Sequence, residues 1–221
     1  MLKIDMHVHT WYSDSKGSVD EVLEVAEAKG LDGLAITDHH TLQGAQEAIK
    51  KAKRLLIIPG EEVKTVQGEV LALGIKSLIP KNLPVMEALR RIHAQGGLAV
   101  VPHPTVPFFS GFKESDLRSL PIDGLEAFSA ITPMAEHYFR KNLELSRRLG
   151  LSITAGSDSH FPETVGDAYT IVCCERRTVN EVLRAIKSGH TKVGGGSSSW
   201  IFKLRMILGM FSHMFSNSCD S

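Results

Sequence analysis

Short apolar segments alternate with amphipathic segments along most of this chain, and this alternation restricts the fold more than any other feature. The apolar runs are typical of buried β-strands, and the segments between them carry apolar residues at helical spacing. The predicted strands cover residues 2–9, 33–37, 55–58, 63–66, 69–75, 98–101, 124–128, 152–155 and 168–173. The predicted helices cover residues 18–30, 42–53, 85–95, 134–149 and 179–188. With 63–66 and 69–75 read as a hairpin, roughly seven strands alternate with helices, which predicts an α/β fold with a parallel sheet, most economically a TIM-like barrel.

Histidines and carboxylates follow these strands. His7 and His9 lie two residues apart in the first strand, so both point to one face, where their imidazoles can share a metal ion. Asp5 lies on that face too, either orienting an imidazole or as an ordinary polar residue at a strand end. Other members of the set lie at or just past the carboxyl ends of later strands: Asp38, His39, Glu62, His103, Asp158 and His160. In parallel barrels that edge carries the active site.

Histidine and carboxylate without nearby thiolate are donors that suit zinc, manganese or iron(II). Taken singly, each residue also has an ordinary structural interpretation. In that interpretation His103 would be a hydrogen-bonded loop histidine between two prolines, and Glu61 and Glu62 would be a solvent-exposed pair. The turn from Asp158 to His160 would then be a helix cap. Their joint placement at successive strand ends favours one metal site at the carboxyl ends of the strands.

Composition narrows the class of partner and the cellular setting. The 221 residues carry 25 basic and 25 acidic side chains, so no overall positive field predicts strong duplex nucleic-acid binding. If a metal site uses several of the carboxylates, the remaining surface is mildly basic and suits an anionic substrate. Three cysteines, two of them adjacent, give no disulfide framework, which favours a reducing, cytoplasmic setting. No apolar run reaches the roughly 18 residues of a transmembrane segment.

The segments that carry these residues resemble the PHP (polymerase and histidinol phosphatase) superfamily of metal-dependent phosphoesterases. The matching stretches are IDMHVHT with Ser13-Asp14, AITDHHTLQG, IIPGEEV, GEVLALGI, VPHP, and AGSDSH followed by Val165-Gly166. The resemblance covers residues 1 to 195 in the expected order. It implies a distorted seven-stranded (β/α) barrel with nine ligand positions for two or three divalent metal ions, such as Zn, Mn or Fe.

The same resemblance implies a role for each ligand position. His7, His9 and Asp158 would hold one metal, and Glu62 would bridge two metals. His103 would complete the second site, and Asp14, His39 and His160 would hold the third. Glu69 occupies a position where many relatives carry His, so its place as the ninth ligand departs from the family pattern.

The implied chemistry uses metal-bound hydroxide as the nucleophile, with no nucleophilic side chain. His160 is a candidate for protonating the leaving group, and His40 is a candidate for contacting the phosphate; an ordinary histidine at the barrel edge is the alternative for His40. Lys16, Lys113 and Arg140 are further candidate phosphate contacts. Phe108 and Phe109 either stack on a base or cover the barrel mouth.

The leading functional prediction is therefore a trinuclear, metal-dependent phosphoesterase. Its substrate would be a small phosphomonoester, or a nucleotide or short oligonucleotide phosphoester. Two alternatives stay open: an amidohydrolase-type C–N hydrolase, and a catalytically silent PHP-like module that binds or regulates a partner. The amidohydrolase class commonly uses a carbamylated lysine as the bridging ligand, whereas the resemblance places Glu62 there.

The last part of the chain differs from the rest. Residues 1–195 are predicted to form the barrel, and residues 196–221 a Gly/Ser link followed by an apolar tail. The apolar tail is expected to form a helix that has to bury its apolar side chains. Docking on the barrel or a homo-oligomer contact is therefore expected, with an interfacial membrane helix as the alternative.

Overall fold

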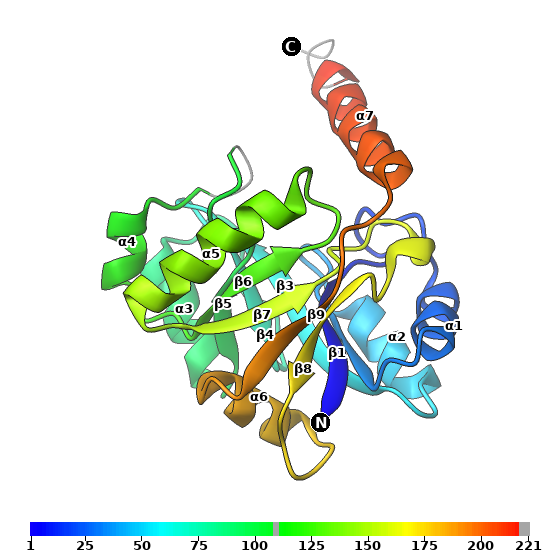
Figure 1. Cartoon of the computed structure of the whole chain (residues 1–221), viewed down its shortest axis with the longest axis horizontal. Coiled ribbons are helices and arrows are strands. Elements are labelled where there is room, and N and C mark those ends of the chain that lie inside the picture. The colour runs from blue at the N-terminus through cyan, green and yellow to red at the C-terminus, as the bar shows by residue number, and fades with distance from the viewer. Residues whose placement is uncertain (108–110, 217–221) are drawn as a thin grey trace.

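The computed structural model describes residues 1–107 and 111–216, with side chains described to residue 208 in the last helix. The predictions for Phe108 and Phe109 lie outside the described residues. A single curved sheet forms the centre of the molecule, with helices around it (Figure 1). Its strands are β1 (Leu2–Val8), β2 (Gly33–Ile36), β3 (Leu56–Lys64), β4 (Glu69–Leu73), β5 (Leu98–Val101), β6 (Gly124–Ser129), β7 (Ser152–Gly156), β8 (Ala168–Val172) and β9 (Thr191–Gly195).

The strand order in the sheet is β7-β6-β5-β4-β3-β2-β1-β8-β9. Beyond the end of β7, the backbone N–H of Asp158 donates to the carbonyl of His7, and the N–H of His9 donates to the carbonyl of Ser159. These two bonds join the seventh strand to the first, so the sheet is nearly closed into a barrel. The α/β class and the barrel-like architecture are therefore confirmed.

The predicted strand number and the all-parallel sheet are wrong. The described part of the chain has nine strands in a mixed sheet. The pairs β1/β2, β2/β3, β5/β6 and β6/β7 are parallel, whereas β4, β8 and β9 run antiparallel to their neighbours. The reversal at β4 follows from the predicted hairpin, because the predicted strands 55–58 and 63–66 are joined in the single strand β3 (Leu56–Lys64), which pairs antiparallel with β4. β9 was missed because its sequence, TKVGG, is short and ends in glycines.

Helices fill the connections between the strands. They are α1 (Val19–Ala28), α2 (Gln43–Lys51), α3 (Val85–Ala94), α4 (Glu114–Ser119), α5 (Ala135–Leu149), α6 (Val179–Lys187) and α7 (Trp200–Ser216), with a 3-10 turn η1 (Pro162–Thr164). Five of them (α1, α2, α3, α5 and α6) correspond to the predicted helices of the barrel, α7 corresponds to the helix expected in the tail, and α4 and η1 were not predicted. Ser18 begins α1 as a capping box, in which its hydroxyl accepts from the N–H of Glu21.

The helix α7 extends away from the barrel (Figure 1). At its start Lys203 is almost fully buried, and the ring of Phe202 lies 5.5 Å from that of Phe161. The apolar side chains at 200, 201, 204 and 208 remain exposed, so docking on the barrel leaves this side of the helix uncovered in the part whose side chains are described. Within the described residues, none of the helices has both the length and the apolar composition required to cross a bilayer. The division of the chain at residue 195 stays a prediction.

Candidate metal centre

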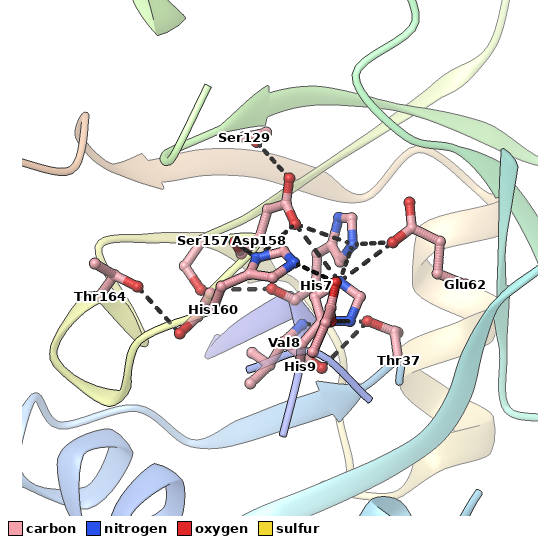
Figure 2. Close-up of polar contacts among 12 residues, drawn as sticks. His7, Val8, His9, Thr37, Glu62, Ser129, Ser157, Asp158, His160 and Thr164 are labelled. Carbon is pink, nitrogen blue, oxygen red and sulfur yellow. Dashed lines mark hydrogen bonds and ion pairs between the residues drawn. The ribbon is translucent and has the colours of Figure 1, made fainter. Parts of the chain in front are cut away.

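The first strand presents two imidazoles on one face, as its period of two predicts. His7 and His9 are both fully buried, and their Nε2 atoms lie 3.0 Å apart (Figure 2). The Nδ1 atom of His7 lies 3.1 Å from Oε1 of Glu126. Because a carboxylate only accepts, His7 donates from Nδ1, and its Nε2 faces the centre of the barrel.

Glu62 and Asp158 bring carboxylates to the same point. Oε2 of Glu62 lies 3.1 Å from Nε2 of His7 and 3.2 Å from Nε2 of His9. Oδ1 of Asp158 lies 3.5 Å from each of these nitrogens. His7, His9 and Glu62 form a group whose donor atoms are close enough to hold one ion, and Asp158 adjoins it.

A second group lies toward the outside of the barrel. Asp14 comes from the loop after β1, His39 from the segment after β2, and His160 from the segment after β7. Oδ2 of Asp14 lies 3.2 Å from Nε2 of His160 and 3.6 Å from Nε2 of His39, and Oδ1 lies 3.7 Å from Nδ1 of His9. These four residues have donor atoms that can hold a metal ion, and His9 belongs to both groups.

A third group consists of Glu62, Glu69 and His103. Nε2 of His103 lies 3.7 Å from Oε1 of Glu62, the oxygen opposite the one that faces His7 and His9. Glu69 begins β4 and pairs with Lys64 across the hairpin. The structure thus brings together all nine predicted ligand positions in three overlapping groups, with Asp158 adjoining the first. Their roles as ligands stay predictions.

His40 lies apart from these groups. Its Nδ1 is 3.9 Å from Oε1 of the buried Glu61, and burial together with Lys81 and Lys64 lowers the pKa of its imidazole. Among the candidate phosphate contacts, Lys16 adjoins the centre, because its backbone N–H donates to the carbonyl of His160 (2.9 Å). Lys113 directly precedes α4, and Arg140 lies on α5.

Glu126 is a buried site residue to which the sequence analysis gave no role. One oxygen contacts Nδ1 of His7, and the other accepts the backbone N–H of His103 (3.1 Å). One carboxylate on β6 thereby orients two candidate ligands from two other segments. Its signal in the sequence was a charged residue in the middle of an otherwise apolar strand, GLEAFS, a position that requires a buried partner.

Asp5 and Asp38 organise backbone around the centre. Asp5 accepts from the N–H and hydroxyl of Ser157 (2.8 and 2.5 Å) and from the N–H of Gly166 (2.8 Å), so it fixes the segment that carries Asp158. Asp38 accepts from the N–H and hydroxyl of Thr10 (2.6 and 2.7 Å) and so holds the loop that carries Asp14. Both carboxylates are used in these hydrogen bonds, and neither residue belongs to the three donor groups. The sequence predicted that both lie near the site, but it did not separate them from the candidate ligands.

Unusual backbone geometry directs three of these side chains. His40, His103 and Asp158 have positive φ angles of 57°, 31° and 55°. Residues other than glycine rarely adopt positive φ angles. Those that do are frequent at functional sites, where the surrounding hydrogen bonds and packing hold the backbone in this conformation. At Asp158 the bond from its N–H to the His7 carbonyl fixes the turn that points its carboxylate at the two imidazoles.

The charges of the centre compensate one another. Burial opposes the charged form of His7, but Asp158 and Glu62 raise the pKa of its imidazole well above the ordinary value, and the same carboxylates raise the pKa of His9 to about 10. Burial opposes ionisation of Glu62 as well, yet His7 and His103 hold its pKa well below the usual range. Protons on imidazoles therefore balance the buried carboxylates here, and a cation can replace them.

Glu69 differs from its neighbours, since burial and the nearby Glu62 raise its pKa to about 7. Two buried atoms of the centre, Nδ1 of His9 and Oε1 of Glu62, have no hydrogen-bond partner among the described residues. Buried polar atoms are normally satisfied, and these two belong to the His and carboxylate groups that divalent ions prefer. The donor set thus fits metal ions and suggests divalent metal binding.

The fold and the site together define an α/β protein with a barrel-like sheet and a His/Asp/Glu cluster whose donor atoms could hold metal ions. The sequence matches the PHP domain over residues 5–69 and the PHP-associated region over residues 136–191. The chain belongs to the PHP family.

Relatives within the family include proteins with and without a stated activity. An uncharacterized protein of Methanocaldococcus jannaschii is 36% identical over 142 residues, which cover 58% of this chain and 82% of the relative. A phosphoribosyl 1,2-cyclic phosphate 1,2-diphosphodiesterase of Eggerthella lenta is 33% identical over 99 residues, covering 41% of this chain and 38% of that enzyme.

Among solved structures, a similar fold occurs in a two-domain protein of Bacteroides vulgatus that contains a predicted PHP-like metal-dependent phosphoesterase. Its TM-score is 0.76 at 18% identity, covering 88% of this chain and 65% of that protein. At this level of identity the comparison supports the fold alone.

Proposed function

We propose that this protein is a metal-dependent phosphoesterase that hydrolyses a small phosphomonoester or a nucleotide or short oligonucleotide phosphoester. The observation that carries the proposal is the overlap of the three donor groups, in which His9 and Glu62 each belong to two groups. Overlapping groups suit two or three ions held close together. Such ions, when bound, activate water and neutralise charge on a phosphoryl group.

In this proposal the residues of the chain hold the ions, orient the ligands and exclude water. His7, His9 and Asp158 hold the first ion, His103 and Glu69 the second, and Asp14, His39 and His160 the third, with Glu62 shared between the first two. The two oxygens of Glu62 face different groups, which supports the shared position. Glu126 orients His7 from behind and fixes the backbone of His103.

His160 is a candidate for proton transfer to the leaving group only in a state in which its imidazole holds no metal ion, and His40 is a candidate for contacting the phosphate. His40 lies beside the proposed ligand His39 but outside the donor groups, and two lysines contribute to lowering the pKa of its imidazole. The positive charge of these lysines supports a position that faces an anion. We expect His40→Ala to lower turnover while leaving the metal content unchanged.

The alternatives have weaker support. The amidohydrolase type commonly has a carbamylated lysine as the bridging ligand, whereas here Glu62 directs its two oxygens toward two different groups. A catalytically silent module does not account for so many buried charged groups held around one point, since each costs free energy unless it is paired. The cyclic phosphate diesterase among the relatives favours phosphoester chemistry.

The test is elemental analysis of the purified protein, combined with hydrolysis of p-nitrophenyl phosphate and its bis ester with and without Mn²⁺. We expect two or three ions per chain and metal-dependent turnover, and His9→Gln should reduce turnover by at least about 100-fold. The exposed His190 supplies the matched control, His190→Gln, which should behave like the unsubstituted protein. Absence of bound metal and of turnover after reconstitution would contradict the proposal.

A further inference from the structure

The first residues of the C-terminal tail contact the segments that surround the metal centre. The backbone N–H of Gly196 donates to the carbonyl of Asp167 (2.7 Å), and the N–H of Ser198 donates to the carbonyl of Ala130 (3.0 Å). The ring of Phe202 lies against that of Phe161, the residue after His160. Residues 196–203, called the strap below, therefore cross the segments that follow β6 and β7.

Lys203 is the residue of the strap that lies deepest in the protein. It is 2% exposed, and its Nζ donates to the carbonyl of Thr132 (2.9 Å) and to the hydroxyl of Ser197. Its ammonium also lies 5.3 Å from the ring centre of Trp200. Among the described residues, no carboxylate lies within ion-pair distance of this buried cation. Burying a cation costs free energy unless it is hydrogen-bonded, so the bonds from Lys203 to its two oxygen partners are important for stability. One of these bonds fixes the position of the Thr132 carbonyl.

A row of hydrogen bonds leads from Thr132 to the metal centre. The hydroxyl of Thr132 donates to the hydroxyl of Ser129 (2.8 Å), and Ser129 donates to Oδ2 of Asp158 (3.3 Å), as Figure 2 shows for the last step. The other oxygen of Asp158 faces His7 and His9. Thr132 and Ser129 are both nearly buried, so water does not replace these bonds freely.

We propose that Lys203 is a positioning residue of the metal centre, which holds Asp158 in its ligating orientation through Thr132 and Ser129. This inference rests on the proposed function, because it assigns Asp158 to a metal. It also makes the strap part of the machinery of the site, although the strap lies beyond the last strand of the sheet. The positive φ of Asp158 adds to the need for such support, since its backbone turn is unfavourable without outside contacts.

The test measures Mn²⁺ affinity by isothermal titration calorimetry, with a thermal melt of each variant to establish that it is folded. We expect Lys203→Met to weaken Mn²⁺ binding by about 10-fold, the lower end of what partners behind a ligand contribute. Arg205→Met is the matched control, since Arg205 is an exposed cation on the same helix, and it should bind Mn²⁺ like the unsubstituted protein.

A double-mutant cycle separates positioning from general stabilisation. If Lys203 acts through Ser129, Lys203→Met combined with Ser129→Ala should weaken binding less than the two single effects combined. Additive effects, or unchanged affinity in a folded Lys203→Met protein, would overturn the inference.

If Lys203→Met does not fold, Thr132→Val decides the question, because it removes the hydroxyl but leaves the carbonyl that Lys203 contacts. Weaker Mn²⁺ binding supports the inference, and unchanged binding overturns it. Absence of Mn²⁺ binding by the unsubstituted protein is a different result, since it would overturn the proposed function and this inference with it.

Discussion

At the scale of single residues, Glu126 shows how much of the centre depends on a side chain that contacts no candidate ion. It is fully buried, and its two oxygens hold the ring of His7 and the backbone of His103. A carboxylate behind an imidazole fixes the tautomer and raises the basicity of the nitrogen that faces the metal. The charge of Glu126 therefore affects the centre as well as its shape.

We expect Glu126→Gln to weaken metal binding by about 10- to 100-fold, because the amide keeps the size of the side chain but removes its charge. Calorimetric titration with Mn²⁺ measures the effect. Glu24→Gln, on the exposed face of α1, is the control and should leave the affinity unchanged. An affinity of Glu126→Gln equal to that of the unsubstituted protein would show that the carboxylate serves only packing.

Glu69 permits a second test at this scale. If it is the ninth ligand, Glu69→Ala should remove an oxygen donor from the group it forms with Glu62 and His103, and so lower metal content by up to one ion per chain. Elemental analysis after dialysis gives the metal content, and the same control at Glu24 applies. A full complement of ions in Glu69→Ala would exclude Glu69 as a required ligand.

The sequence sufficed to predict most of these residues and failed for the ones behind them. The meeting of His7 and His9 was predictable because strand periodicity places them on one face. Glu62 was expected just past the end of a strand, whereas β3 continues through it to Lys64. The part played by Glu126 was not, since its partners lie 119 and 23 residues away and only the folded sheet brings them together. Likewise, the positive φ of Asp158 could not be predicted from the spacing of residues in the sequence.

At the scale of elements, β9 is the strand that sequence patterns miss, and two glycines are necessary for its position. A Cβ at Gly194 would lie 2.4 Å from the ring of Tyr169, and a Cβ at Gly195 would lie 2.1 Å from the carbonyl oxygen of Asp167. Gly195 also has a positive φ of 83°. Gly194 and Gly195 therefore allow close pairing of β9 with β8.

We expect Gly195→Ala to lower the free energy of unfolding by at least about 1 kcal/mol, because the new methyl group meets backbone at a left-handed position. Denaturation in urea, followed by circular dichroism, measures the change. Gly196→Ala is the matched control, since a Cβ there has no neighbour within 4 Å. Equal stability of the two variants would contradict this account of β9.

At the scale of the whole molecule, the exposed side of α7 is the most conspicuous surface. Trp200, Ile201, Leu204 and Leu208 are each between 55% and 66% exposed, and their spacing places them along one side of the helix. The expected homo-oligomer contact stays a prediction, and this apolar stripe is the surface that would form it.

We expect the double substitution of Leu204→Glu and Leu208→Glu to lower the molecular mass in solution to that of one chain, because charge on the stripe opposes its burial. Light scattering after size exclusion, over a range of protein concentrations, gives the mass. Glu24→Lys on α1 serves as a control for the change in surface charge. A single-chain mass for the unsubstituted protein at every concentration would remove the oligomer prediction.

The position of β1 affects how the protein is made. One half of its edge pairs with residues 170–172 of β8, and the other half pairs with residues 158 and 159. During synthesis the two histidines of this strand leave the ribosome well before the residues that pair with this part of the edge, because about 150 residues separate them. Contacts between such distant segments form slowly. The three donor groups are therefore complete only after residue 160 has been translated, and a shorter nascent chain lacks part of the candidate metal centre.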